Sequence, residues 1–172
     1  KLMKSKKNIV LIGMMGSGKS LIGKILSKKL NLEFIDIDNK IEINEKKTIS
    51  DIFKINGEKY FRKVEENISL EYLVLENKII SLGGGGYINP KIRKQCMKNN
   101  ISVWLNWKEE TLIERIKNSK KRPLAFKMNI SEIKKLISER SKIYNFSDYK
   151  INCDKINKNE IVKKIIKFYE NL

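Results

Sequence analysis

The sequence predicts an α/β fold in which five parallel strands form one sheet flanked by helices. Five short apolar runs alternate with segments of helical periodicity, which is typical of buried parallel strands joined by helices. The runs lie at 8–12, 33–36, 78–82, 101–105 and 149–152. The 172 residues suffice for one buried core and are too few for two ordinary domains. We therefore expect a single domain over residues 1–172.

A glycine-rich motif follows the first run directly. Residues Gly13-Met-Met-Gly16-Ser17-Gly18-Lys19-Ser20 match G-x-x-x-x-G-K-[ST]. In this pattern the glycines turn backbone N–H groups toward the β- and γ-phosphates, Lys19 adds positive charge, and the Ser20 hydroxyl can ligate Mg²⁺. An apolar stripe at helical spacing comes next: Leu21, Ile22, Ile25, Leu26 and Leu30. We expect a nucleoside triphosphate site here; the alternative is a chance glycine-rich turn.

The second run ends in Phe34-Ile35-Asp36-Ile37-Asp38. Ligands of open α/β sheets bind beyond the carboxyl ends of the strands. Strand alternation would place the two carboxylates on one side, about 7 Å apart at their Cα atoms. Asp36 is expected to face Mg²⁺ through water, and Asp38 an accepting hydroxyl. Two solvated turn aspartates are the alternative.

Helix boundaries are predicted by capping patterns. A capping box at Thr48–Asp51 predicts a helix start, and Gly57 predicts a helix end. Three further helix starts are predicted: a cap and first-turn proline at Asn89-Pro90, Ser131 opening a helix over 131–144, and Asn157 with Glu160 opening the last helix.

The third run is followed by four successive glycines, Gly83-Gly84-Gly85-Gly86. Such a run brings bare backbone N–H groups against a ligand; a merely flexible turn is the alternative. Upstream, Arg62 and Glu65 share a helix face at i, i+3, where the carboxylate could orient the guanidinium. Residues 119–129 form a basic loop, expected to be a lid that closes over a triphosphate.

Composition narrows the function. The formal charge is +17, yet the 37 basic residues are spread along the chain, and no basic stripe has interleaved aromatics, so no nucleic acid is expected as partner. Only five are Arg, and their planar forks favour anion binding, with Arg93 assigned instead to a surface ion pair. The absence of His leaves carboxylates as proton acceptors.

The sequence also indicates a cellular compartment for the protein and an origin for its first two residues. The two cysteines lack a C-x-x-C partner, which favours reduced structural thiols. No apolar run approaches a membrane span and no signal peptide opens the chain, so a cytoplasmic protein without a membrane partner is expected. Residues 1–2, before Met3, are expected to be a remnant foreign to the natural chain.

Together the motifs resemble the shikimate kinases over nearly the whole chain. The resemblance is carried by Gly13–Ser20, Asp36-x-Asp38, Arg62 with Glu65, Gly83-Gly84-Gly85, Arg122-Pro123-Leu124, and Glu139-Arg140 with Tyr144. It implies a three-layer P-loop kinase fold with a mobile lid. It also implies transfer of the ATP γ-phosphoryl group to the 3-hydroxyl of shikimate, in chorismate and aromatic amino-acid biosynthesis, by a Mg²⁺-dependent enzyme that is expected to be a monomer.

The resemblance also assigns roles to residues. It implies that Lys19, Asp38 and Arg122 are catalytic residues. The residues that it implies bind ATP are Gly16, Ser17, Gly18, Lys19, Ser20, Leu21, Arg115 (against adenine) and Arg122. The implied shikimate-binding residues are Asp38, Arg62, Gly84, Gly85 and Arg140. The implied metal-binding residues are Ser20 and Asp36. Whether Asp38 takes a proton or only orients the hydroxyl stays open.

The sequence departs from the family pattern at two places, and it lacks the motifs of several other protein classes. Ser141-Lys142-Ile143 stand where the family usually has a proline and a leucine before the tyrosine, and Leu21 stands where threonine is common. A regulatory GTPase would carry N-K-x-D, whereas the nearest match is Asn39-Lys40-Ile41-Glu42. A transport or motor ATPase would close its third strand with an acidic residue. A kinase for gluconate or nucleoside monophosphates is the alternative within the fold, and a nucleic-acid-binding protein is the alternative outside it.

Overall fold

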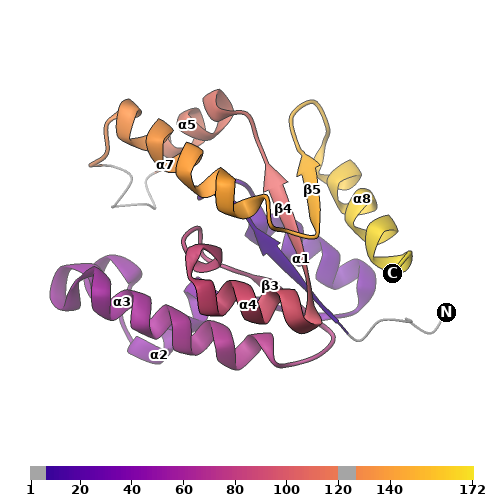
Figure 1. Cartoon of the computed structure of the whole chain (residues 1–172), viewed down its shortest axis with the longest axis horizontal. Coiled ribbons are helices and arrows are strands. Elements are labelled where there is room, and N and C mark those ends of the chain that lie inside the picture. Colours follow the sequence, from indigo (N-terminus) through magenta and orange to yellow (C-terminus); the bar gives the residue numbers. More distant parts are fainter. Residues whose placement is uncertain (1–6, 120–126) are drawn as a thin grey trace.

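A five-stranded sheet forms the centre of the computed structural model, which describes residues 7–119 and 127–172 (Figure 1). All four strand pairs are parallel, in the order β2-β3-β1-β4-β5. The strands are β1 (Asn8–Ile12), β2 (Glu33–Asp36), β3 (Lys78–Ser81), β4 (Asn100–Asn106) and β5 (Tyr149–Asn152). The predicted fold class is thus confirmed; β3 is one residue shorter than predicted, and β4 extends one residue further at each end.

Helices connect the strands and cover both faces of the sheet (Figure 1). They are α1 (Lys19–Leu30), α2 (Ile37–Glu45), α3 (Ile49–Leu73), the 3₁₀ turn η1 (Gly86–Ile88), α4 (Pro90–Asn99), α5 (Glu109–Lys117), α7 (Ile130–Tyr144) and α8 (Lys158–Glu170).

The alternation of side chains along the strands divides the core into two layers. In β1, Ile9 and Leu11 face α1 and α8, whereas Val10 and Ile12 face the layer to which α2, α3, α4, α5 and α7 contribute. All four of these side chains are at most 1% exposed. A strand buried on both faces reads as a continuous apolar run, which is why the sequence predicted these strands well.

One helix start differs from the predicted one, that of α7. Asn129, not Ser131, caps α7, and it forms a reciprocal capping box with Glu132. Ser is as favourable an N-cap as Asn, but only Asn129 has a glutamate three residues later, Glu132, which completes the capping box. Gly57 interrupts its helix as predicted: with φ of 82° it is non-helical and separates two helices that share the label α3, the second of which runs to Leu73.

The remaining caps agree with the predictions. The Thr48 side chain accepts from Asp51 N, and Asn89 precedes Pro90 as the cap of α4. Asn157 and Glu160 form the capping box of α8.

The two cysteines, Cys96 and Cys153, are buried free thiols. Burial raises the pKa of each to about 12, so both stay protonated and unreactive. Within the part of the chain that the structure describes, no helix is long and apolar enough to cross a bilayer.

Candidate active site

Residues 13–20, which form the turn after β1 and the first two residues of α1, are called the phosphate loop below. Gly13, Gly16 and Gly18 adopt φ of 147°, 85° and 86°, a region that side chains enter only with strain. The Lys19 ammonium donates to the carbonyls of Gly13 (2.8 Å) and Met14 (3.0 Å). The loop therefore wraps around a lysine at the start of a helix, where free N–H groups and the helix dipole favour an anion.

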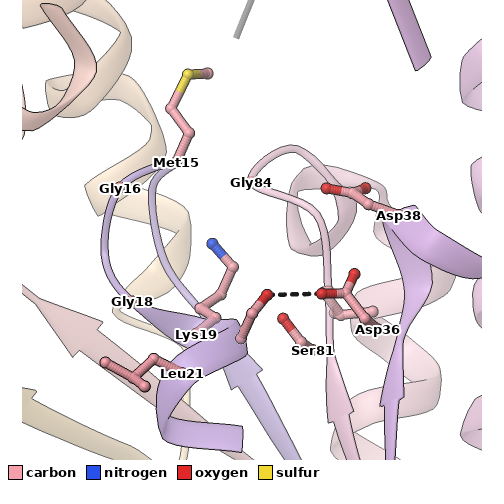
Figure 2. A pocket seen from close by; sticks show the side chains of 11 residues that line it. Met15, Gly16, Gly18, Lys19, Leu21, Asp36, Asp38, Ser81 and Gly84 are labelled. Atoms are coloured by element: carbon pink, nitrogen blue, oxygen red, sulfur yellow. Dashed lines mark hydrogen bonds between the residues drawn. The ribbon is translucent and has the colours of Figure 1, made fainter. Parts of the chain in front are cut away.

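A pocket opens between the phosphate loop and the ends of β2 and β3 (Figure 2). Its lining includes eight residues predicted for the site: Gly16, Gly18, Lys19, Ser20, Leu21, Asp36, Asp38 and Gly84. Leu21 lies at this pocket and is 52% exposed, so it does not join the buried stripe of α1. Met15, Ser81 and Leu82 also line the pocket and were not predicted as site residues. Their positions inside the loop motif and at the end of β3 were the available signals.

Asp36 and Ser20 meet at one side of this pocket (Figure 2). The Ser20 hydroxyl donates to Asp36 Oδ2 at 2.6 Å, and Asp36 Oδ1 accepts from Asn39 N as the N-cap of α2. Two hard oxygen donors beside a phosphate loop fit Mg²⁺, which usually keeps several waters and takes one or two protein oxygens together with phosphates.

Asp38 reaches the same pocket from a different element than predicted. β2 ends at Asp36, and Asp38 lies in the first turn of α2, so strand alternation does not relate the two carboxylates. Burial, and secondarily the charge of Asp36, raises the pKa of Asp38 to about 6, against the lowering effect of Lys19. The carboxylate thus sits where it is less solvated than an ordinary surface aspartate.

Residues 83–86 are called the glycine loop below, and charged side chains pack directly against them. A Cβ on Gly83 would lie 2.7 Å from Asp38 Oδ1, and one on Gly85 would lie 2.9 Å from Arg62 Cζ. A Cβ on Gly84 would lie 3.2 Å from Arg140 Nη1. The structure therefore gathers Asp38, Arg62 and Arg140 around this loop, and glycine is needed because a side chain would displace them.

The two arginines are held differently. Arg62 Nη1 donates to Glu65 Oε1 at 2.8 Å, the contact that the i, i+3 spacing suggested. Glu65 is 2% exposed. Arg140 Nη1 is buried and makes no hydrogen bond in the described part of the chain. A buried guanidinium donor without a partner is costly, so this atom marks a place for an acceptor from a ligand.

On the other side of the phosphate loop, Arg115 stacks on Trp107 with its Cζ 3.8 Å from the ring centroid. Arg115 Nη1 donates to Gly16 O, and Trp107 Nε1 donates to the carbonyl of buried Ser17 at 2.8 Å. Arg115 thus lies beside the phosphate loop. Trp107 was not predicted, although an aromatic residue directly after β4 was a usable signal.

The predictions for the remaining arginines, Arg93 and Arg122, have different outcomes. Arg93 was expected to make a surface ion pair, but it makes none among the described residues: its Nη1 donates to the carbonyls of Tyr87 and Ile88 at 3.0 Å each and supports η1. The helix α4 places its guanidinium over that turn, where backbone carbonyls compete with any distant carboxylate. Arg122 and most of the expected lid at 119–129 lie outside the described residues.

Comparisons with known proteins agree with one another. A family model for shikimate kinase matches residues 15–170. The shikimate kinase of Sulfurihydrogenibium sp. (strain YO3AOP1) is 42% identical over 160 residues, which cover 93% of this chain and 96% of that protein.

Solved structures give the same result. A shikimate kinase from Acinetobacter baumannii in complex with shikimate has a TM-score of 0.89 at 28% identity, over 96% of this chain and 93% of the other. Shikimate kinase from Aquifex aeolicus has a TM-score of 0.84 at 39% identity, over 93% of this chain and 94% of the other.

Proposed function

The chain belongs to the shikimate kinase family of ATP-dependent kinases, and from this premise we propose how its residues act. The proposed reaction moves the γ-phosphoryl group of ATP to the 3-hydroxyl of shikimate and releases ADP, a step of chorismate and aromatic amino-acid biosynthesis. The observation that best supports it is the buried Nη1 of Arg140 at the glycine loop, which has no hydrogen-bond partner in the described part of the chain. Shikimate carries one carboxylate, which would supply the missing acceptor.

The proposed acceptor site is the space around the glycine loop. Arg140 and Arg62 come from α7 and α3 and offer planar forks that match a carboxylate bidentately. Glu65 fixes the Arg62 guanidinium, so little rotamer entropy is lost on binding. The N–H groups of Gly84 and Gly85 are proposed to complete the site.

Asp38 is proposed to meet the 3-hydroxyl. It lies close to Gly83, at the side of the pocket shared with Lys19. At pH 7 a carboxyl with a pKa near 6 is mostly ionised, yet it is a stronger proton acceptor than an ordinary aspartate. It would orient the hydroxyl, and it can take the proton as the oxygen bonds to phosphorus.

The phosphate loop is proposed to hold ATP. Its backbone N–H groups and the Lys19 ammonium would bind the β- and γ-phosphates, since the bonds from Lys19 to its own loop can be exchanged for phosphate oxygens. Arg115 and Leu21 would lie along the nucleotide, and Arg122 is proposed, from the motif alone, to reach the phosphates. Ser20 and Asp36 would hold Mg²⁺, which neutralises phosphate charge when bound.

The proposed chemistry is an in-line transfer. The oxygen of the 3-hydroxyl forms a bond to the γ-phosphorus, the bond from that phosphorus to the β,γ-bridging oxygen breaks, and the hydroxyl proton leaves to Asp38 or water. Such transfers depend mainly on positioning and charge neutralisation, which Lys19 and the arginines supply. The partners are therefore two small molecules, ATP and shikimate, bound by one chain.

An acceptor panel tests this function. Purified protein with Mg-ATP is assayed for ADP release with shikimate, gluconate and nucleoside monophosphates as separate acceptors. We expect ADP release to depend on shikimate and shikimate 3-phosphate to be formed in equal amount. Turnover with gluconate or a nucleotide but not with shikimate would overturn the proposal.

A further inference from the structure

Tyr144 makes a buried contact that the proposed mechanism does not use. It is the last residue of α7, is 1% exposed, and donates its hydroxyl to the Gly84 carbonyl at 2.5 Å. Its ring packs on buried Trp104 with 5.6 Å between centroids. The ring is therefore fixed by the core, while the hydroxyl holds one carbonyl of the glycine loop.

That one bond fixes the orientation of a peptide group. The carbonyls of Gly83 and Gly85 accept from the N–H groups of Gly86 and Ile88 within the turn, whereas the Gly84 carbonyl accepts from Tyr144. A trans peptide is planar, with its C=O and N–H pointing opposite ways. Anchoring the Gly84 carbonyl to α7 thus also sets the direction of the Gly85 N–H.

Arg140 stands on the same face of α7 as Tyr144. The two residues are four apart, which places them one helical turn from each other. Arg140 Nη1 also approaches Gly84, at 3.2 Å from where its Cβ would be, and has no hydrogen-bond partner of its own among the described residues. The Tyr144 bond therefore joins the helix that carries this guanidinium to the glycine loop.

We propose that Tyr144 is a positioning residue for shikimate, which ties the glycine loop to α7 and so sets the spacing between the Gly85 N–H and the Arg140 guanidinium. The inference rests on the proposed function, because it takes the acceptor to lie between these two groups. Burial raises the pKa of the Tyr144 hydroxyl to about 12, so it remains a hydrogen-bond donor throughout the working range.

The test compares Tyr144→Phe with Tyr169→Phe. Tyr169 is also buried, at 4% exposed, and its hydroxyl also donates to a backbone carbonyl, that of Lys7, but it packs in the layer of α1 and α8. We expect Tyr144→Phe to raise the KM for shikimate about tenfold, which corresponds to about 1.4 kcal/mol, and to weaken shikimate binding in calorimetry equally. The KM for ATP and kcat should stay within twofold, and Tyr169→Phe should leave all these values within twofold.

Three results would overturn the inference. One is a wild-type KM for shikimate in Tyr144→Phe. Another is equal weakening of shikimate and ATP. The third is a loss of Tm well beyond that of Tyr169→Phe, since a merely structural hydroxyl would act on both ligands through the fold. Failure of the proposed function is recognised separately, because the wild-type enzyme would then show no ADP release with shikimate.

Discussion

At the scale of single residues, two charged side chains of the site are poorly compensated within the protein. Arg140 has a buried nitrogen with no acceptor among residues 7–119 and 127–172, and Asp38 is ionised at pH 7 despite poor solvation. Such groups cost folding free energy and are retained where a ligand uses them. The two carboxylates differ in this respect, because Asp36 is already engaged by Ser20 and caps a helix.

That difference predicts separate effects of the two carboxylates. Asp36→Asn should raise the Mg²⁺ concentration needed for half-maximal activity, with partial rescue by excess metal, because it weakens an oxygen ligand. Asp38→Asn should lower kcat by at least about tenfold and weaken shikimate binding at an unchanged Mg²⁺ requirement, since the amide cannot take a proton. Magnesium titrations at saturating ATP measure both. Metal rescue of Asp38→Asn instead of Asp36→Asn would refute the assignment.

Asp38 also predicts how stability depends on pH. Its pKa in the folded protein is about 6, above the ordinary 3.8, so ionising it costs more when folded than when unfolded. Its contribution is fully present below pH 3.8 and is lost as the pH rises through 6. Without metal, Asp38→Asn should therefore raise the free energy of unfolding by about 1–2 kcal/mol at pH 7.5, after allowance for solvent screening.

The same variant should match the wild type near pH 4. Urea denaturation at the two pH values in the presence of a chelator measures this. A variant that is less stable than the wild type at pH 7.5 would contradict the pKa assigned to Asp38.

At the scale of elements, β-strands and helices were predictable where the pattern is local. A continuous apolar run marks a strand buried on both faces, and Asn157 with Glu160 marks a helix start, and both were confirmed. The end of β2 at Asp36 was predicted, but the start of α2 at Ile37 was missed, since Ile35 and Ile37 are both buried and continue the apolar pattern. The turn there is set by the Asp36 cap and not by hydrophobicity.

The start of α7 gives a matched test of capping. Asn129 accepts from Glu132 N at 2.8 Å, while Ser131 is an exposed residue inside the helix. Asn129→Ala should lower the free energy of unfolding by about 1 kcal/mol, and Ser131→Ala should change it by less than about 0.5 kcal/mol. Urea midpoints of the two variants measure the difference. Equal losses would contradict the assignment of Asn129 as the cap, and a larger loss in Ser131→Ala would favour the predicted start.

At the scale of the whole molecule, the fold brings together residues that no spacing relates. Arg62 and Arg140 lie 78 positions apart in the chain, yet both reach the glycine loop from α3 and α7. Parallel strands place the phosphate loop, Asp36 and the glycine loop at one edge of the sheet, and this much follows from the fold class. The arrival of the arginines depends on helix packing over the sheet, so only the family resemblance could predict it.

The central claim is that these arginines bind the acceptor and not the nucleotide. Isothermal titration calorimetry of Arg140→Lys with shikimate and, separately, with Mg-ATP tests it most directly, because lysine keeps the charge and loses the bidentate fork. The account predicts that shikimate binding weakens at least about tenfold, or about 1.4 kcal/mol, while ATP binding stays within about twofold. Equal weakening of both ligands, or weakening of ATP alone, would contradict it.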